Sequence, residues 1–256
     1  MGGALAQRLS QTNQLFLYDH HIKKAEHLAE EGYGKAYRDI RDALHTSEMI
    51  ILAAKPQNLK QVAALVKDGL QENQVIVSLL AGTPVATLRR YFPTAPMVRM
   101  MPNLALIHGE GIIGLSSDEK VRKEDKEQLT TSFETLGKVY WIPEEKMDAL
   151  TALASSGPAF FFTMVEAMID AGIAMGFTAK DARGLVCQML QGSLALLEKT
   201  HKHPGELRWQ IASPQGTTIA GLRKLEELAL RGGVINTFLA AYEHGCNLSS
   251  QSNKQE

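Results

Sequence analysis

The sequence predicts an α/β protein, with a doubly wound parallel sheet in its first half and an all-helical domain in its second. Up to Pro143, short runs rich in Ile, Val and Leu alternate with longer amphipathic stretches, which is the rhythm of β-α-β units. From there to Leu248 the strand signals stop, and the chain reads as helices separated by Gly and Pro. We therefore expect a first domain over residues 1–143 and a helical domain over residues 144–256.

The first domain is expected to contain six strands with helices between them. The strands are predicted at Leu15–Asp19, Met49–Ala54, Val75–Leu80, Met97–Met101, Ile112–Leu115 and Val139–Ile142. The helices are predicted at His21–Glu31, Asp39–Thr46, Gln57–Leu70, Val85–Tyr91 and Val121–Leu136. Unbroken apolar strands of this kind are typical of a parallel sheet that helices cover on both faces.

Composition and charge exclude several classes of partner. The chain has 256 residues, 45% of them apolar, and a net charge of -1 without a basic face, which argues against nucleic acid and anionic membranes as partners. Cys187 and Cys246 stand far apart without a further ligand, so we expect free buried thiols and no metal site. The apolar run 158–175 contains Glu166 and Asp170, which favours a helix buried in protein over a membrane span. The start of the sequence does not resemble a secretory signal, and a cytoplasmic location is expected.

Gly2 and Gly3 stand directly before the first helical stretch. Together with the β-α rhythm that follows, Gly2 is interpreted as the last glycine of a dinucleotide-binding fingerprint, in which a helix N-terminus receives the pyrophosphate. The strand and the first two glycines of such a fingerprint are absent from the sequence. We therefore expect a sheet that lacks its first strand.

Asp19 ends the next predicted strand, where a carboxylate would bind the adenosine ribose hydroxyls. His20, Lys23 and Lys24 follow it and could instead meet a 2'-phosphate, so the choice between NAD and NADP stays open. The alternative is that Asp19 and these basic residues only cap and solvate the following helix.

Other cofactor candidates lie where predicted strands end, because the carboxyl edge of a parallel sheet is where ligands bind. They are Ala53, Ala54, Lys55, Pro56, Ala81 and Asn103. Asn103 could meet a carboxamide. Ordinary strand-to-helix turns, and a turn residue after Pro102, are the alternatives.

The strongest local signal is the segment IASPQGTTIAGL, in which Ser213 and Pro214 precede a helix entered through Gly216, Thr217 and Thr218. Backbone N–H groups and hydroxyls converge there at the positive end of a helix dipole, which suits a small carboxylate. A plain helix cap is the alternative, although two threonines and a glycine exceed what capping requires.

In this order, the segments MGGALA, AAKP, SLLAG, RMMPN, ASSGPAFFF, HPGEL and SPQGTTIAGL resemble the pyrroline-5-carboxylate reductase family over essentially the whole chain. The resemblance implies a Rossmann domain that binds NADP or NAD, followed by a helical dimerisation domain. It also implies a cyclic imine carboxylate as substrate, and a homodimer that can assemble into larger rings.

The resemblance also assigns the substrate site. It implies that Thr218 donates a proton to the imine nitrogen, and that Glu144 lies near the nicotinamide and the substrate. The substrate-binding residues that it implies are Glu144, Gln210, Ser213, Gly216, Thr217 and Thr218. Gln215 departs from the family pattern, which usually has a small residue at this position.

The chemistry is consistent with this assignment. Hydride attack on a C=N bond gives an amine that protonates readily, so a hydroxyl is a sufficient donor. A hydroxy-acid dehydrogenase would need a Lys or His base near the interdomain helix, and residues 154–176 contain no Lys, Arg or His. A non-catalytic regulatory member of the family and a reductase of another cyclic imine acid remain as alternatives.

Overall fold

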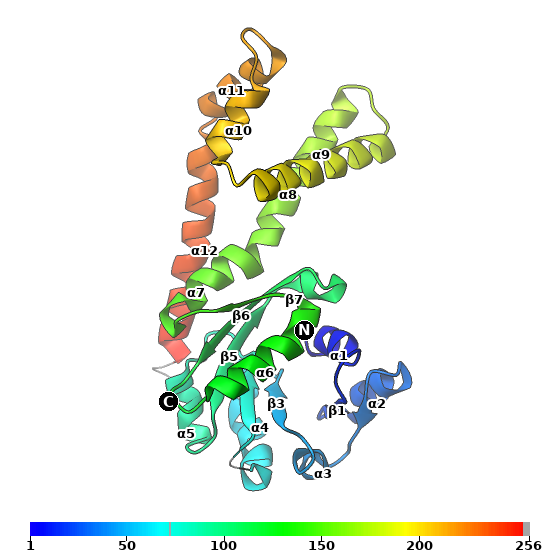
Figure 1. The fold of residues 1–256 in the computed structure, drawn as a ribbon, viewed down its shortest axis with the longest axis vertical. Helices are drawn as coiled ribbons and strands as arrows, with labels where there is room; N and C mark the ends of the chain where they lie inside the picture. The colour runs from blue at the N-terminus through cyan, green and yellow to red at the C-terminus, as the bar shows by residue number, and fades with distance from the viewer. Residues whose placement is uncertain (72, 253–256) are drawn as a thin grey trace. The chain divides into compact units, whose positions relative to one another are not determined.

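A computed structural model describes residues 1–71 and 73–252, which form two compact units (Figure 1). The first unit comprises residues 1–156 and 241–256, and the second comprises residues 157–240. The domains predicted from the sequence differ from these units in where they place residues 144–156 and the end of the chain. The predicted boundary stays a prediction.

Seven strands lie among the described residues of the first unit. They are β1 Phe16–Leu17, β2 Lys35–Ala36, β3 Met49–Leu52, β4 Val75–Ser78, β5 Met97–Pro102, β6 Gly111–Ser117 and β7 Gly137–Trp141. The helices of its first part are α1 Gly2–Leu9, α2 Ile22–Glu30, α3 Ile40–Leu44, α4 Leu59–Val66, α5 Val85–Tyr91 and α6 Lys123–Phe133. The six predicted strands and five predicted helices are confirmed in kind and order; β1, β3, β4 and four of the helices are shorter than predicted, whereas β5, β6 and β7 are longer and α5 has the predicted bounds. The two-residue strand β2 was not predicted.

Strands β3 to β7 form one sheet in chain order, and β1 and β2 form a separate parallel pair. The pairs β3–β4, β4–β5 and β6–β7 are parallel, whereas β6 runs antiparallel to β5. The predicted parallel sheet is present in β3, β4 and β5, whereas β6 and β7 run in the opposite direction, which the sequence did not predict. The connection over residues 103–110 is too short for the crossover that a parallel return needs, so the chain folds back beside β5.

Helices cover both faces of this sheet, as a doubly wound fold requires. On one face Val77, Val98 and Met100 pack with Leu5 of α1 and Phe133 of α6. The other face packs against α4 and α5, in a second cluster that includes Ile50, Leu52, Ile76, Leu59 and Leu88. Alternate residues of the central strands thus point into two separate cores, which explains why these strands are apolar throughout.

The β1–β2 pair is separate from the five-stranded sheet, and we call the unpaired strand position between β1 and β3 the open place. No strand among residues 1–71 and 73–252 joins these two, and each pairs with a strand neighbour on one side only. Leu15, just before β1, and Met49 and Ile51 of β3 are only half-buried, although they pack against the first core. The expected gap in the sheet is therefore present.

The second unit and the helices that join it follow Pro143. The helices are α7 Met147–Leu150, a π-helix at Thr151–Ser156, α8 Gly157–Ala174, α9 Ala179–Thr200, α10 Pro204–Ile211, α11 Thr217–Glu227 and α12 Leu230–Ser252. The all-helical second half is confirmed. Helices α8 and α9 pack closely at Gly172, where an added Cβ would lie 2.8 Å from the Cβ of Ala182. The rings of Phe160 and Phe238 meet edge to face at 5.2 Å.

This unit buries little of its apolar surface within the chain. Only Gly157, Gly172 and Ala182 are buried in α8 and α9, while Phe161 and Met168 are exposed. The continuous helical stretch Glu144–Ala174 is long and apolar enough to cross a membrane, judged by length and composition alone. The expectation that this run is buried is not met within a single chain.

The expected burial of the cysteines was wrong. Cys187 is exposed and Cys246 is half-buried, although both are free thiols as predicted. Cys187 is exposed because its face of α9 has little cover within the chain. Helix α12 continues to Ser252, and residues 253–256 lie outside the described part.

We predict that an extended apolar segment joined in front of Met1 stabilises the protein. Gly2 lies beside Ala53, just past the end of β3, so a strand running into α1 would lie parallel to β3 in the open place. Pairing two open edges and covering half-buried apolar side chains should add about 2 kcal/mol or more, which raises the melting temperature by about 4–8 °C in a chain of this size. Calorimetry measures the change.

The control is the same extension with two prolines in its centre, which cannot pair on both sides. Equal melting temperatures for the apolar and the proline-containing extensions would show that the place between β1 and β3 does not take a strand.

Candidate functional site

The cofactor candidates gather at one edge of the sheet. Because β3, β4 and β5 are parallel neighbours, their carboxyl ends point to the same edge. Residues 53–56 follow β3, Ala81 follows β4, and Asn103 follows β5. The N-terminus of α1 also reaches this edge, since an added Cβ on Gly2 would lie 3.2 Å from the Cβ of Ala53. The structure therefore brings the fingerprint glycine next to the predicted AAKP turn.

The residues of this edge leave room for a phosphate-bearing ligand. Gly3, Ala53, Lys55 and Pro56 are exposed, and Gly2 and Ala54 are half-buried. Helix α1 has no side-chain cap at its start, so its first N–H groups point to this edge without a side-chain partner among the described residues. Small side chains, a lysine and a helix N-terminus fit a pyrophosphate.

Asp19 follows the separate strand β1, and its Oδ1 accepts a hydrogen bond of 2.8 Å from the backbone N–H of His21. His21 is the residue before α2. This bond closes a turn before the helix, and α2 itself has no side-chain cap, so the helix-capping alternative is not supported. His20 is exposed beside it, and its ring is tilted by 47° against that of His21, with the centroids 3.8 Å apart.

The turn after β4 contains Ala81 and Gly82. Gly82 has a φ of +66°, a left-handed conformation that glycine adopts without strain. A Cβ at this position would lie within 4 Å of the backbone of Leu248 and Ser249 in α12. The hydroxyl of Ser249 also donates a 3.0 Å hydrogen bond to Oδ1 of Asp148 in α7. The end of α12 therefore covers this turn and ties it to the helices that follow β7.

Asn103 is buried, and both ends of its side-chain amide have protein partners. Its Nδ2 donates to the carbonyl of Ala154 at 3.0 Å, and its Oδ1 accepts from the N–H of Ile112 at 3.1 Å. The hydroxyl of Ser155 donates to the carbonyl of Pro102 at 3.2 Å. Asn103 thus joins the end of β5 to β6 and to the π-helix at the start of the interdomain helix. A π-helix leaves carbonyls free for such bonds and often lies at functional sites.

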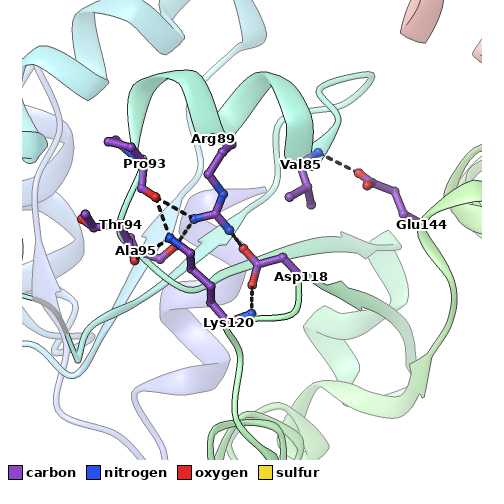
Figure 2. A network of polar contacts seen from close by, with 8 residues as sticks. All are labelled: Val85, Arg89, Pro93, Thr94, Ala95, Asp118, Lys120 and Glu144. Atoms are coloured by element: carbon purple, nitrogen blue, oxygen red, sulfur yellow. Dashed lines mark hydrogen bonds and ion pairs between the residues drawn. The ribbon is translucent and has the colours of Figure 1, made fainter.

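Glu144 lies at the same edge, in the segment that leaves β7 (Figure 2). Its Oε1 accepts a hydrogen bond of 2.7 Å from the backbone N–H of Val85, the first residue of α5. The same oxygen pairs with Nη1 of Arg99 at 3.0 Å. The side chain of Arg99 is 6% exposed and that of Glu144 is 37% exposed, so a buried charge in β5 is neutralised by a carboxylate that still reaches solvent.

A second charged cluster in Figure 2 is structural. Arg89 forms an ion pair with Asp118 and donates to the carbonyls of Pro93 and Ala95. Lys120 donates to the carbonyl of Pro93 at 2.7 Å. These bonds hold the chain between α5 and β5, away from the carboxyl ends of the strands.

The predicted substrate turn lies in the second unit. Gly216 precedes α11 without a side-chain cap, and its N–H bonds to the carbonyl of Ser213 at 3.1 Å. A Cβ at Gly216 would lie 2.3 Å from Oγ of Ser213, so a side chain at this position would displace that hydroxyl. Thr217 is exposed and Thr218 is half-buried in the first turn of α11. Free N–H groups and two hydroxyls therefore gather at the start of an eleven-residue helix, as a carboxylate site requires.

Gln215 has a φ of +59°, a left-handed backbone that costs a residue with a side chain about 1 kcal/mol. This conformation explains why a small residue is usual here. Gln210 is exposed near the end of α10. The substrate candidates are thus divided between the units, with Glu144 in the first and the others in the second.

Sequence reasoning gave no role to Arg99 or Ser155. Arg99 begins the segment RMMPN, and an arginine inside an apolar strand was a signal that it has a buried partner. That the partner is Glu144, far away in the sequence, follows only from the fold.

Comparisons with known proteins agree with this geometry. Residues 144–248 match the family of pyrroline-5-carboxylate reductase dimerisation domains, and residues 1–82 match the family described as NADP oxidoreductase, coenzyme F420-dependent. The pyrroline-5-carboxylate reductase of Mycobacterium leprae is 35% identical, over 86% of this chain and 83% of its own length. That of Methanosarcina acetivorans is 34% identical, over 80% and 76%. A crystal structure of Plasmodium falciparum pyrroline carboxylate reductase with NADP bound superposes with a TM-score of 0.87 at 27% identity, over 97% of this chain and 94% of that one.

We predict that Asn103→Ala destabilises the first unit. It leaves the N–H of Ile112 and the carbonyl of Ala154 without their partner, which should lower the free energy of unfolding by about 2–4 kcal/mol. Denaturant unfolding measures this change. Asn13→Ala is the control, because Asn13 makes its two hydrogen bonds in a half-exposed turn and should cost less than about 1 kcal/mol. Similar losses for both variants would contradict a linking role for Asn103.

Proposed function

The chain belongs to the pyrroline-5-carboxylate reductase family, and from this premise we infer that it reduces Δ1-pyrroline-5-carboxylate to L-proline with a hydride from NADH or NADPH. The observation that carries this proposal is the family match along most of the chain, together with an uncapped helix start at Gly216 to Thr218 that suits the substrate carboxylate. Such a reaction completes proline biosynthesis.

The first unit would hold the cofactor. The N-terminus of α1, with Gly2 and Gly3, suits the pyrophosphate, and the turns at Ala53 to Pro56 and at Ala81 line the same edge. Asp19 suits the ribose, while His20 next to it suits either a ribose or a 2'-phosphate. When bound, the nicotinamide supplies the hydride.

The chain's own residues would orient the substrate and supply a proton. Ser213, Gly216 and the N–H groups of Thr217 and Thr218 bind the carboxylate at the positive end of α11. The hydroxyl of Thr218 donates a hydrogen bond to the ring nitrogen, which becomes basic as the hydride adds to the neighbouring carbon. Gln210 and Glu144 complete the substrate site in this proposal.

We propose that two copies of the chain form a homodimer through the helical unit, and that dimers can assemble further into rings. The match to a dimerisation family over residues 144–248 supports this, as does the exposed apolar surface of α8 and α9. A partner would also cover the apolar helix Glu144–Ala174, so we propose a cytoplasmic enzyme without a membrane span.

The function is tested by mixing the purified protein with Δ1-pyrroline-5-carboxylate and each reduced nicotinamide, and following loss of nicotinamide absorbance and appearance of proline. We expect turnover with the five-membered ring and much slower turnover with its six-membered analogue. A higher kcat/KM for the six-membered ring would favour another cyclic imine acid. Cofactor binding without reduction of either ring would favour a regulatory role.

We predict that Thr218→Ala lowers kcat about 10²–10⁴-fold, the usual range for loss of a positioned proton donor, with little effect on cofactor affinity. Thr218→Ser, which keeps a hydroxyl, should retain most of the activity. Thr217→Ala should mainly raise the KM for the imine, because it removes a hydroxyl from the carboxylate turn. An unchanged kcat in Thr218→Ala would remove this hydroxyl from the mechanism.

We predict that the protein sediments as a dimer or a larger assembly at micromolar concentration. Phe161 and Met168 are 43% and 37% exposed in one chain, and burying what remains exposed of such side chains stabilises association by about 1 kcal/mol each. Met168→Asp should shift the protein toward the monomer. A folded monomer of the unchanged chain would contradict the proposal.

A further inference from the structure

We propose that Arg99 is a positioning residue for the reduction, acting through Glu144. This inference rests on the proposed function, in which Glu144 lies beside the substrate. It assigns to Arg99 the task of holding one carboxylate oxygen of Glu144, so that the other faces the carboxyl edge of the sheet.

The burial of Arg99 shows that it needs its partner. It lies in β5 between residues that are almost fully buried, and its own side chain is 6% exposed. A guanidinium in such a place is stable only when it is paired. The pairing atom is Oε1 of Glu144 at 3.0 Å, and the described residues leave no buried side-chain nitrogen or oxygen without a hydrogen bond.

The geometry of Glu144 is fixed by two donors on a single oxygen. Nη1 of Arg99 and the N–H of Val85 both bond to Oε1, at 3.0 and 2.7 Å. Oε2 has no hydrogen-bond partner in the part of the chain that the structure describes, and the side chain is 37% exposed. Glu144 is therefore held at one oxygen and open at the other, an arrangement suited to accepting a hydrogen bond from a ligand.

Arg99, Val85 and Glu144 come from three different segments that meet at the carboxyl edge of the sheet. Arg99 belongs to β5, which ends at Pro102, the residue before Asn103. Val85 begins α5, just after the turn at Ala81. Glu144 begins the segment that leads into the interdomain helix. Loss of Arg99 would free Glu144 to turn away from this edge, without removing any atom that touches the substrate.

The test compares kcat and KM for Arg99→Met, Arg99→Lys, Glu144→Ala and the double variant Arg99→Met/Glu144→Ala, after turnover of the unchanged protein is established. Misplacing one polar group by about 1 Å can cost up to about 10²-fold in rate, so Arg99→Met should lower kcat by about 10–10²-fold. Arg99→Lys should restore much of it, since a single donor is needed. In the double variant, removing Arg99 should add no further loss to that of Glu144→Ala.

The matched control is Arg89→Met, which breaks the ion pair with Asp118 in the same unit. It should lower the melting temperature and leave kcat unchanged below that temperature. If Arg99→Met behaves like Arg89→Met, or if the losses from Arg99 and Glu144 simply multiply, Arg99 is not a positioning residue.

A readout without substrate separates this proposal from the proposed function. The exchange of the Val85 amide with solvent deuterium should be faster by about tenfold or more in Arg99→Met and unchanged in Arg89→Met, because only the first frees Glu144 from Val85. Unchanged exchange in Arg99→Met overturns the inference even if the unchanged protein is fully active. If the Arg99→Met variant exchanges faster but the unchanged protein reduces neither imine, the hydrogen bonds that hold Glu144 are supported and the proposed function is wrong.

Discussion

The parallel pairing of β3, β4 and β5 is the constraint on which the proposed cofactor site depends. The carboxyl ends of three parallel neighbours lie at one edge of the sheet. Strand direction alone therefore brings the turns that follow them to the same edge. The helix that begins at Gly2 packs on the same sheet and starts at the same edge. Strand direction therefore determines where the proposed site lies, and the residues in the turns determine what it can bind.

That edge is also where the first unit connects to the helices after β7. Asn103 bonds to the π-helix, Glu144 bonds to β5 and α5, and Ser249 of α12 bonds to Asp148. The bonds of Asn103 and Glu144 join the sheet and α5 to the segment that leads from β7 to the second unit. The bond of Ser249 joins α12 to α7. A shift in the position of these helices would therefore also move residues at the proposed cofactor site.

The sequence was sufficient for the parts of the fold that repeat locally. Apolar strands, amphipathic helices and the carboxyl edge followed from periodicity, and the family followed from the order of short motifs such as SPQGTTIAGL. The direction of β6 was missed because it depends on the length of one connection rather than on pattern. The bonds of Asn103 and Glu144 were missed because Ala154 and Arg99 approach them only in the folded chain. The residue assignments at Thr218 and Glu144 stay predictions.

The most direct test of a cofactor site at this edge is hydrogen-deuterium exchange with and without saturating NADPH, in the absence of substrate. We expect slower exchange at the start of α1, at residues 53–56 and at the turn after β4, and no change at α6 and β7, where β7 is the strand at the other end of the sheet from β3. Protection confined to α6 and β7, or none at the three turns while NADPH is bound, would contradict the account.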